Sequence, residues 1–391
     1  MAQIYFDHSA TTPLDPRVVE AMLPFYGANF GNPSSLHWAG QQAKQAIDEG
    51  RRQVADLFHA SPEEIIFTAS GTESDNMLLA GVAGLYQAQD CHIITSSFEH
   101  PAILETCKHL EKLGYAISYL PVTSEGIVTP EALKAALRPN TRLVSVMAAN
   151  NVVGTLQPLA DLAQVTKAHG ALFHTDAVQA VGKIPLHMDT LPVDSLSLSA
   201  HKLHGPKGIG ALYIRRGLKI EPLVYGGGQE RGLRSATENV AAIAGLGKAA
   251  EIAASEMSAE ASRLVRLRDR VIETIQAEIP NAYMIGHRYK RLPGHICLGF
   301  AGQEGEAIKL MLSLNDEGIA ISTGSACSSH HAGQPSYILM AMGLDPVRAR
   351  GSLRITLGRF NTDAEVDTFL EILPRLVAEM RPVTSRAFTS A

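Results

Sequence analysis

The fold is decided by the stretch that runs from His92-Ile-Ile-Thr95, through a helical pattern at Ile103 to Leu113, to Arg142-Leu-Val-Ser-Val-Met147. Each apolar run has the length and composition of a buried strand. A strand, a helix and a further strand at this spacing indicate a mostly parallel sheet that is covered by helices on both faces. The stretch therefore predicts an α/β protein.

The same alternation continues on both sides of this stretch and ends near residue 222. Further strands are expected at Glu64-Ile-Ile-Phe-Thr68, Ala171-Leu-Phe-His174 and Val193 to Leu198, and a further helix from Pro130 to Ala136. These elements extend the predicted sheet in both directions.

The segment from Ala241 to Glu278 is different. It is rich in Ala, Glu, Arg and Leu and contains no Pro, which predicts one long helix. After it, strands at Gly294 to Phe300 and Leu353 to Leu357 flank a helical stretch from Glu304 to Leu314. We expect a large domain of residues 16–260 and a smaller α+β domain of residues 1–15 and 261–391.

The bulk composition is that of a soluble globular protein. The 391 residues are 46% hydrophobic and 19% charged, and the net charge of −5 gives no reason to expect binding to nucleic acid or to an anionic membrane. The first residues lack the pattern of a signal or transit peptide, and no apolar run is long enough to span a bilayer. The four cysteines form neither a disulfide framework nor the CxxC spacing of a zinc site. We expect a cytoplasmic protein without a metal site.

Lys202 stands in a position that suits a reactive lysine. It follows the strand-like run Val193 to Leu198 and precedes the turn Gly205-Pro206. A lysine that carries an aldehyde cofactor as a Schiff base needs a fixed, partly desolvated position, because its amine must lose a proton. Taken alone, however, a lysine at a strand end is more often a surface residue.

Asp176 strengthens the interpretation of Lys202. It lies at the end of the strand that begins at Ala171, and ligands of open α/β sheets collect at the carboxyl ends of the strands. A carboxylate there can keep the pyridine nitrogen of pyridoxal phosphate (PLP) protonated. The alternative is a carboxylate that caps a helix or lies in a loop.

Two further features suit the same cofactor. Phe67-Thr-Ala-Ser-Gly-Thr-Glu-Ser-Asp-Asn76 ends a strand with a glycine turn and opens a helix expected from Met77 to Leu85. Backbone N–H groups there suit a phosphate, although simple capping gives the same pattern. His100 follows the next strand, where an imidazole could stack on the cofactor ring and move protons, or be an ordinary structural histidine.

Several motifs occur in the order found in one enzyme family. They are Asp7-His-Ser-Ala-Thr-Thr-Pro13, Gly31-Asn-Pro-Ser-Ser35, Ser70-Gly-Thr-Glu-Ser-Asp-Asn76, Glu99-His100, His174-Thr-Asp-Ala-Val-Gln179, Ser199-Ala-His-Lys202 and Gly226-Gly-Gly-Gln-Glu-Arg-Gly-Leu-Arg-Ser235. With them the chain resembles the NifS/IscS type of cysteine desulfurase, in class V of the fold-type I PLP enzymes, over nearly its whole length. The resemblance implies conversion of L-cysteine to L-alanine, with sulfur passed to an iron–sulfur scaffold or another acceptor.

The resemblance also implies a role for each matching residue. Lys202 would carry PLP, Asp176 would pair with its ring nitrogen, and His100 would stack on the ring and share in proton transfer. Gln179 would hydrogen-bond the ring oxygen, and Asn151 would lie near cofactor and substrate. The phosphate ligands would be Gly71, Thr72, Ser199, His201 and, from the other subunit of a homodimer, Thr237. Arg354, with Asn32 as a helper, would grip the carboxylate of the substrate.

The sequence departs from the family at two of these loops. Val152 stands where the family usually has Glu, and Ala236 stands where Gly is usual. The missing Glu is expected to alter the hydrogen bonding of its loop, but neither change removes a catalytic group.

The loop Ser322-Thr-Gly-Ser-Ala-Cys-Ser-Ser-His-His-Ala-Gly-Gln-Pro335 carries Cys327 among small residues. This composition predicts a mobile, accessible loop, and His330 and His331 could favour the thiolate. By resemblance Cys327 is the catalytic cysteine that takes sulfur as a persulfide. The alternatives are an incidental exposed thiol or a metal site shared with the two histidines. We expect the other cysteines to be structural: Cys91 at the start of a strand, Cys107 in a helix and Cys297 in a strand.

Other functions remain open on the sequence. The nearest are other class V PLP enzymes, namely a small-substrate aminotransferase, a cysteine/cystine lyase or a selenocysteine lyase. A non-catalytic partner of sulfur-transfer proteins belongs to a different class, but such a protein seldom retains every cofactor-binding group.

Overall fold

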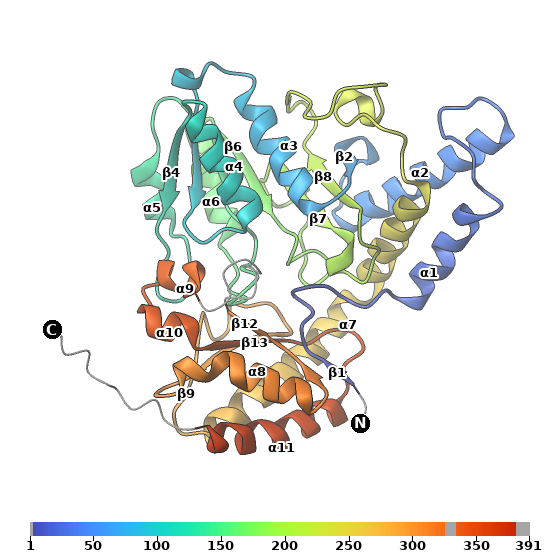
Figure 1. Cartoon of the computed structure of the whole chain (residues 1–391). Coiled ribbons are helices and arrows are strands. Elements are labelled where there is room, and N and C mark those ends of the chain that lie inside the picture. Colours follow the sequence, from blue (N-terminus) through green and yellow to red (C-terminus); the bar gives the residue numbers. More distant parts are fainter. Residues whose placement is uncertain (1–2, 325–333, 381–391) are drawn as a thin grey trace.

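The computed structural model describes residues 3–324 and 334–380. A seven-stranded sheet forms the centre of its larger part (Figure 1). In spatial order the strands are β2 (Ile65–Thr68), β8 (Gly210–Ile214), β7 (Ser195–Ser199), β6 (Leu172–Asp176), β5 (Thr141–Ser145), β3 (His92–Ser96) and β4 (Ala116–Leu120). Strand β8 is antiparallel to both of its neighbours, and the other neighbouring pairs are parallel. The prediction of a mostly parallel sheet is confirmed.

The two faces of the sheet bury alternate residues, as the pleat of a strand requires. In β3, Ile93 belongs to the apolar cluster of one face and Ile94 to that of the other. In β5, Leu143 and Val144 divide in the same way. Both faces are therefore apolar, which explains why these strands read as continuous hydrophobic runs.

Helices cover both faces. The face that buries Ile93 packs against α3 (Gly71–Ala83) and α4 (Pro101–Lys112). The other face is covered by α1 (Pro16–Met22), α2 (Trp38–Leu57), α5 (Pro130–Ala136), α6 (Leu159–His169) and the first part of α7 (Val240–Glu278). Short 3₁₀ turns connect these elements: η1 (Leu23–Tyr26), η2 (Pro62–Glu64), η3 (Ala88–Asp90), η4 (Ala200–Lys202) and η5 (Glu230–Gly232).

A separate apolar core lies at the other end of α7 (Figure 1). It surrounds an antiparallel sheet in the order β12 (Ser322–Thr323), β13 (Ser352–Thr356), β10 (His295–Phe300), β9 (Ala282–Met284). The pair β1 (Ile4–Tyr5) and β11 (Ile319–Ala320) lies beside it. The helical elements of this part are η6 (Glu304–Glu306), α8 (Ala307–Asp316), α9 (Tyr337–Ala341), α10 (Pro346–Arg350) and α11 (Asp363–Glu379).

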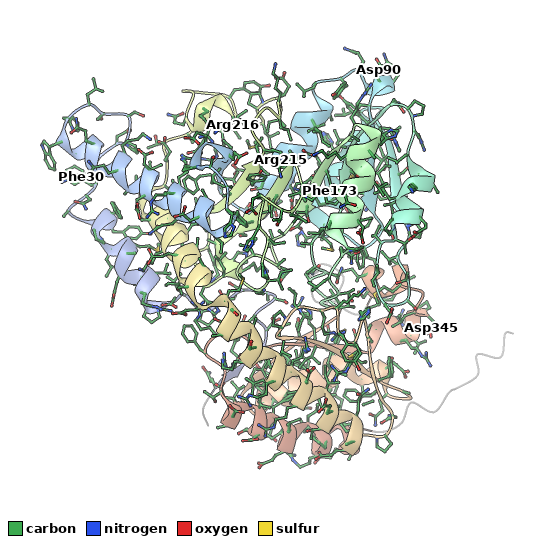
Figure 2. All side chains as sticks on the ribbon, turned by 180° about the vertical axis from the view of Figure 1, so that it is seen from behind. Phe30, Asp90, Phe173, Arg215, Arg216 and Asp345 are labelled. Atoms are coloured by element: carbon green, nitrogen blue, oxygen red, sulfur yellow. The ribbon has the colours of Figure 1, made fainter. Side chains whose placement is uncertain are left out.

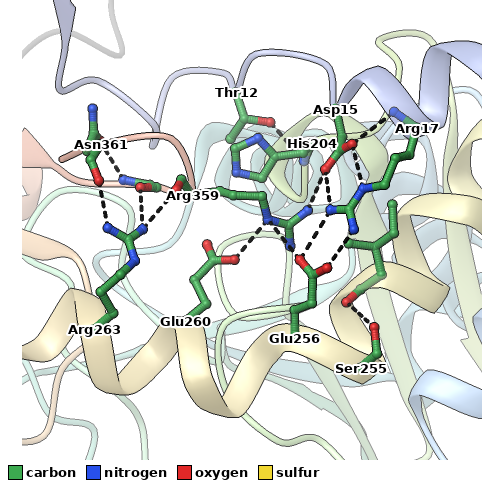
Figure 3. Close-up of polar contacts among 12 residues, drawn as sticks. Thr12, Asp15, Arg17, His204, Ser255, Glu256, Glu260, Arg263, Arg359 and Asn361 are labelled. Atoms are coloured by element: carbon green, nitrogen blue, oxygen red, sulfur yellow. Dashed lines mark hydrogen bonds and ion pairs between the residues drawn. The ribbon is translucent and has the colours of Figure 1, made fainter.

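Arg359 joins the two parts of the molecule by ion pairs (Figure 3). It donates to Asp15 Oδ2 and to Glu260 Oε2, each at 2.9 Å. On α7, Arg263 donates to the carbonyl oxygens of Asn361 at 2.6 Å and of Arg359 at 2.9 Å. These contacts fix the segment after β13 against α7 and the start of α1.

Several boundaries differ from the sequence-based expectation. The helix expected from Met77 begins at Gly71, because Ser70 Oγ caps it by accepting from Glu73 N at 3.1 Å. The stretch expected as helix from Glu304 begins as the 3₁₀ turn η6, and Cys91 precedes β3 rather than opening it. Strands β4 and β8 were not predicted. In the described ranges, no helix is long and apolar enough to cross a membrane.

Candidate active site

The carboxyl ends of four neighbouring strands converge on one cavity of about 380 Å³. Asp176 closes β6, Ser199 closes β7, His100 follows β3, and Asn151 follows β5. All four line the cavity, because parallel neighbours bring their carboxyl ends to the same edge of a sheet. This edge is therefore the candidate active site.

Lys202 enters the cavity from η4, the single turn that follows β7. Its ammonium donates to Ala10 O at 2.8 Å and to Ser9 O. Thr12 N in turn donates to His201 O at 3.0 Å, so the N-terminal segment is tied to the lysine turn. The side chain is held at a fixed, partly buried point, as a cofactor-bearing lysine requires.

Asp176 is buried, and its Oδ1 accepts from Val178 N at 2.9 Å. Burial raises the pKa of the Asp176 carboxyl, while the charges of His100 and Lys202 oppose that shift. A positive group placed in the cavity beside this carboxylate would relieve the cost of its burial. The geometry therefore suits a protonated ring nitrogen as partner.

A second carboxyl, Asp75, is buried close to Asp176. Burial and the charge of Asp176 raise the pKa of Asp75 well above its usual value. His174 Nε2 lies 3.7 Å from Asp75 Oδ1, but burial lowers the pKa of His174 to about 3, so the ring is neutral. No role was predicted for Asp75, which belongs to the motif Ser70–Asn76. Only its position one helical turn after Gly71 could have pointed to the site.

The N-terminus of α3 lies at the cavity, where an anion site was expected. Gly71 and Thr72 line the cavity at the first turn of the helix, where N–H groups have no partner within the helix. Gly71 is required there, because a Cβ would lie 2.5 Å from Val178 Cγ2. Ser199 and His201 line the same cavity, and burial and the charge of Lys202 lower the pKa of His201 to about 4. His201 would thus hold an anion by hydrogen bonding, not by charge.

His100 caps α4 as well as lining the cavity. Its Nδ1 accepts from Ala102 N at 3.1 Å, so this nitrogen keeps its lone pair and the neutral ring carries its proton on Nε2. Burial lowers the pKa of His100, while Asp176 opposes that shift. The imidazole is thereby set as a neutral donor toward the cavity.

Arg354 approaches from β13 and forms the opposite wall. It is 2% exposed, and it donates to Asn151 O at 3.1 Å and to Asp7 Oδ1 at 2.8 Å. Asp7 was not predicted as a site residue, although it opens the first motif shared with the family. Gln179 also lines the cavity and donates through Nε2 to Ser9 O at 3.0 Å.

A family model described as aminotransferase class-V matches residues 4–369. The chain belongs to this family.

Relatives within the family are named as cysteine desulfurases. Cysteine desulfurase IscS of Dictyoglomus turgidum is 49% identical over 382 residues, which are 98% of this chain and 96% of that one. Cysteine desulfurase of a Nostoc species is 47% identical over 384 residues, with 98% and 95% covered. A solved structure titled NifS-like protein has a TM-score of 0.90 and 41% identity, and covers 96% of this chain and 100% of its own. The predictions of the family, of its fold and of a PLP-dependent cysteine desulfurase are confirmed.

The cavity of this class V chain fits PLP by the chemistry of its walls. A carboxylate, an amine and a helix N-terminus stand around one space whose volume lies within the usual range of small-ligand pockets. Of the predicted site residues, ten line this cavity: Gly71, Thr72, His100, Asn151, Asp176, Gln179, Ser199, His201, Lys202 and Arg354.

Three predicted residues are not among them. Asn32 is exposed in the connection between α1 and α2. Thr237 is exposed and lines a different cavity of its own chain, beside Thr68. Cys327, with His330 and His331, lies outside the described residues, but Ser322 lines the site cavity and pairs with Arg354 across β12 and β13.

Proposed function

We propose that this chain converts L-cysteine to L-alanine and takes the sulfur as a persulfide on Cys327. One observation carries the proposal: a single cavity joins Lys202, Asp176 and Arg354, and the segment that leads to Cys327 starts at its wall with Ser322. The amine of Lys202 and the carboxylate of Asp176 suit PLP, and the guanidinium of Arg354 suits the carboxylate of an amino acid. The thiol of Cys327 accounts for the removal of sulfur from the substrate.

In this proposal PLP, held by Lys202, Asp176 and the N-terminus of α3, supplies an electron sink that weakens bonds at the α-carbon of the substrate. Asp176 keeps the ring nitrogen protonated. Gly71, Thr72, Ser199 and His201 hold the phosphate, and Gln179 holds the ring oxygen.

His100 and Lys202 have different roles in proton transfer. The Nδ1 lone pair of His100 is engaged by Ala102 N, and its Nε2 carries a proton. His100 is therefore suited to donate a proton, whereas the amine of Lys202, once displaced by the substrate, is suited to take the α-proton. This assignment narrows the sequence-based expectation, in which either residue moved that proton.

Cys327 is the thiol best suited to attack sulfur. The other cysteines are buried, and burial raises the pKa to about 11 for Cys91 and to about 12 for Cys107 and Cys297. Only the thiolate is a good nucleophile, so these three are inert at neutral pH. The Cys327 persulfide would then pass its sulfur to a protein acceptor such as an iron–sulfur scaffold.

We propose that the active form is a homodimer. Large apolar side chains are exposed on the arm around α1 and α2: Leu23, Tyr26, Phe30, Leu36 and Trp38. Figure 2 shows Phe30 at the outer end of this arm. Exposed apolar side chains gathered on one segment are typical of an interface. Thr237, which does not line the site cavity of its own chain, would reach the site cavity of the partner subunit.

The expected division into residues 16–260 and residues 1–15 with 261–391 fits this function. The site cavity takes Lys202 and Asp176 from the first part and Asp7 and Arg354 from the second. The unpaired, buried thiols of Cys91, Cys107 and Cys297 support the expected cytoplasmic location.

The test measures sulfide, alanine and pyruvate released from L-cysteine with a thiol reductant. Equal yields of sulfide and alanine are expected, lost in Cys327→Ser and kept in the matched control Cys107→Ser. Pyruvate in place of alanine, or full activity without Cys327, would contradict the proposal and favour a lyase. Turnover of selenocysteine that does not depend on Cys327 would favour a selenocysteine lyase.

A further inference from the structure

A second, smaller cavity adjoins the active site. It has a volume of about 40 Å³ and shares Lys202 and Ser9 with the site cavity. Its other walls come from α7, from residues 292–295 and from residues 356–359. A cavity needs roughly 10–15 Å³ to hold one water, so this space is large enough for water. His8, which lines it, is 3% exposed, and in the described part of the chain neither ring nitrogen has a hydrogen-bonding partner.

Lys183 lines this second cavity and connects it to the active site. Residues 178–183 form turns, with Gly182 in the left-handed region at a φ of 73°, and these turns bring the side chain of Lys183 back to Gln179. Lys183 Nζ donates to Gln179 Oε1 at 3.3 Å, while Gln179 Nε2 donates to Ser9 O at 3.0 Å. Both ends of the Gln179 amide are therefore engaged, and the bond from Lys183 favours the orientation in which Nε2 faces Ser9.

The charge of Lys183 also acts on Lys202. Burial lowers the pKa of Lys183 to about 7, the charge of Lys202 adds to this shift, and Glu260 opposes it. Coulomb repulsion is mutual, so a charged Lys183 disfavours a second charge on Lys202. The groups that face Lys183 are Lys202 of η4, Glu260 of α7, Arg354 of β13, Arg359 after β13, and the rings of His8, His201, His204 and His295. Glu260 is already paired with Arg359.

We infer that Lys183 is a positioning residue of this active site: its ammonium orients the Gln179 amide from behind and disfavours a positive charge on Lys202. The inference rests on the proposed function in one respect, namely that Lys202 carries the cofactor and Gln179 meets its ring oxygen.

The test follows the visible absorption band of PLP bound to Lys202 as a function of pH, without L-cysteine. In Lys183→Met, loss of the neighbouring cation should favour the protonated form and move the midpoint up by roughly 0.5–1 pH unit. Lys183→Arg keeps a cation at every pH and should hold the midpoint at or below that of the native protein. Lys207→Met is the matched control. Lys207 is exposed, so this substitution removes the same charge without disturbing Gln179.

A midpoint in Lys183→Met equal to that in Lys207→Met would overturn the inference, as would an upward shift in Lys183→Arg. If Lys183→Met does not fold, Lys183→Gln replaces it: this change removes the same charge but keeps a donor for Gln179 Oε1, so the midpoint should again rise, and an unchanged midpoint would overturn the inference. The titration does not involve Cys327 or the substrate. A native protein that binds no PLP would contradict the proposed function instead.

Discussion

Arg354 Nη2 lies 2.8 Å from Asp7 Oδ1, so the arginine expected to bind the substrate is already paired with a carboxylate of the N-terminal segment. The guanidinium is nearly inaccessible to solvent, and a buried cation without a partner is strongly destabilising. Asp7 thus compensates the charge of Arg354 and holds the side chain in place before any substrate arrives. A substrate carboxylate would join this pair instead of meeting an isolated arginine.

The first prediction concerns this arginine. Arg354→Lys should raise the KM for L-cysteine at least tenfold and change kcat less, because lysine offers a point charge instead of two parallel hydrogen bonds. Steady-state kinetics measures both constants. The control is Arg359→Lys, which disturbs the ion pairs to Asp15 and Glu260 and should lower the melting temperature with KM unchanged. Equal effects of the two variants on KM would argue against substrate binding by Arg354.

A second prediction separates the two tasks of His100. Asparagine is a good N-cap and alanine is not, so His100→Ala should lose about 0.5–2 kcal/mol of stability relative to His100→Asn. Both variants lack the imidazole, so both should lose about 10²- to 10⁴-fold in kcat. Thermal unfolding and kinetics measure the two effects separately. Near-native turnover in His100→Asn would show that the histidine serves only as a cap.

The third prediction concerns Glu99, a buried carboxyl that accepts from Met147 N at 3.0 Å and from Ser96 Oγ. Burial raises its pKa to about 8, so the native state binds more protons than the unfolded state between about pH 4.5 and pH 8. Stability should therefore fall across that interval, by a few kcal/mol at about 1.4 kcal/mol per pH unit.

Glu99→Gln keeps an accepting oxygen and removes this titration. Its melting temperature should match that of the native protein near pH 4.5 and exceed it by a growing margin up to pH 8. Above pH 8 the difference in melting temperature should stay constant. The exposed Glu105→Gln serves as the control and should follow the native curve at every pH. A Glu99→Gln advantage that does not grow with pH would contradict the raised pKa.

The fourth prediction tests whether Thr237 acts across a dimer. A Thr237→Val homodimer should bind PLP about tenfold more weakly, as loss of one hydrogen bond to a charged group implies. In a mixed dimer of one Thr237→Val subunit and one Lys202→Ala subunit, the site that keeps Lys202 receives the intact Thr237 from the other subunit. Half of its sites should then bind PLP with native affinity, measured by the absorbance of the lysine-bound cofactor. Uniformly weak sites would place Thr237 in the site of its own chain.

Much of the large sheet could be predicted because its strands are buried on both faces. The apolar residues of β3 and β5 form continuous runs without the 3.6-residue spacing of a helix, so they indicate strands. Helix α5 was predicted with its observed bounds, Pro130–Ala136. Strand β4 was missed because most of its residues are only partly buried, so its sequence is less uniformly apolar. The antiparallel direction of β8 depends on its partners in space, and no local pattern encodes it.

The site was predicted as a set of residues but not as a network. Lys202 follows a strand and Asp176 ends one. The carboxyl ends of neighbouring parallel strands lie at the same edge of a sheet, so both residues could be recognised as site residues from the sequence. The contacts of Ser9 with Lys202 and of Asp7 with Arg354 join segments some two hundred and three hundred and fifty positions apart, respectively. Such pairs depend on how the two cores pack, and only the three-dimensional structure reveals them.

Helix α7 has a mechanical consequence for this enzyme. Its 39 residues make a rod about 58 Å long at 1.5 Å per residue, and each end is embedded in a different core. Strand β6, which ends in Asp176, packs into the core at one end of this rod, and strand β13, which carries Arg354, packs into the core at the other end. A stiff element outside the cavity thus supports the spacing between Asp176, expected to pair with the cofactor, and Arg354, expected to bind the substrate carboxylate. We therefore expect the site to disfavour an amino acid whose carboxylate lies one carbon further from the cofactor.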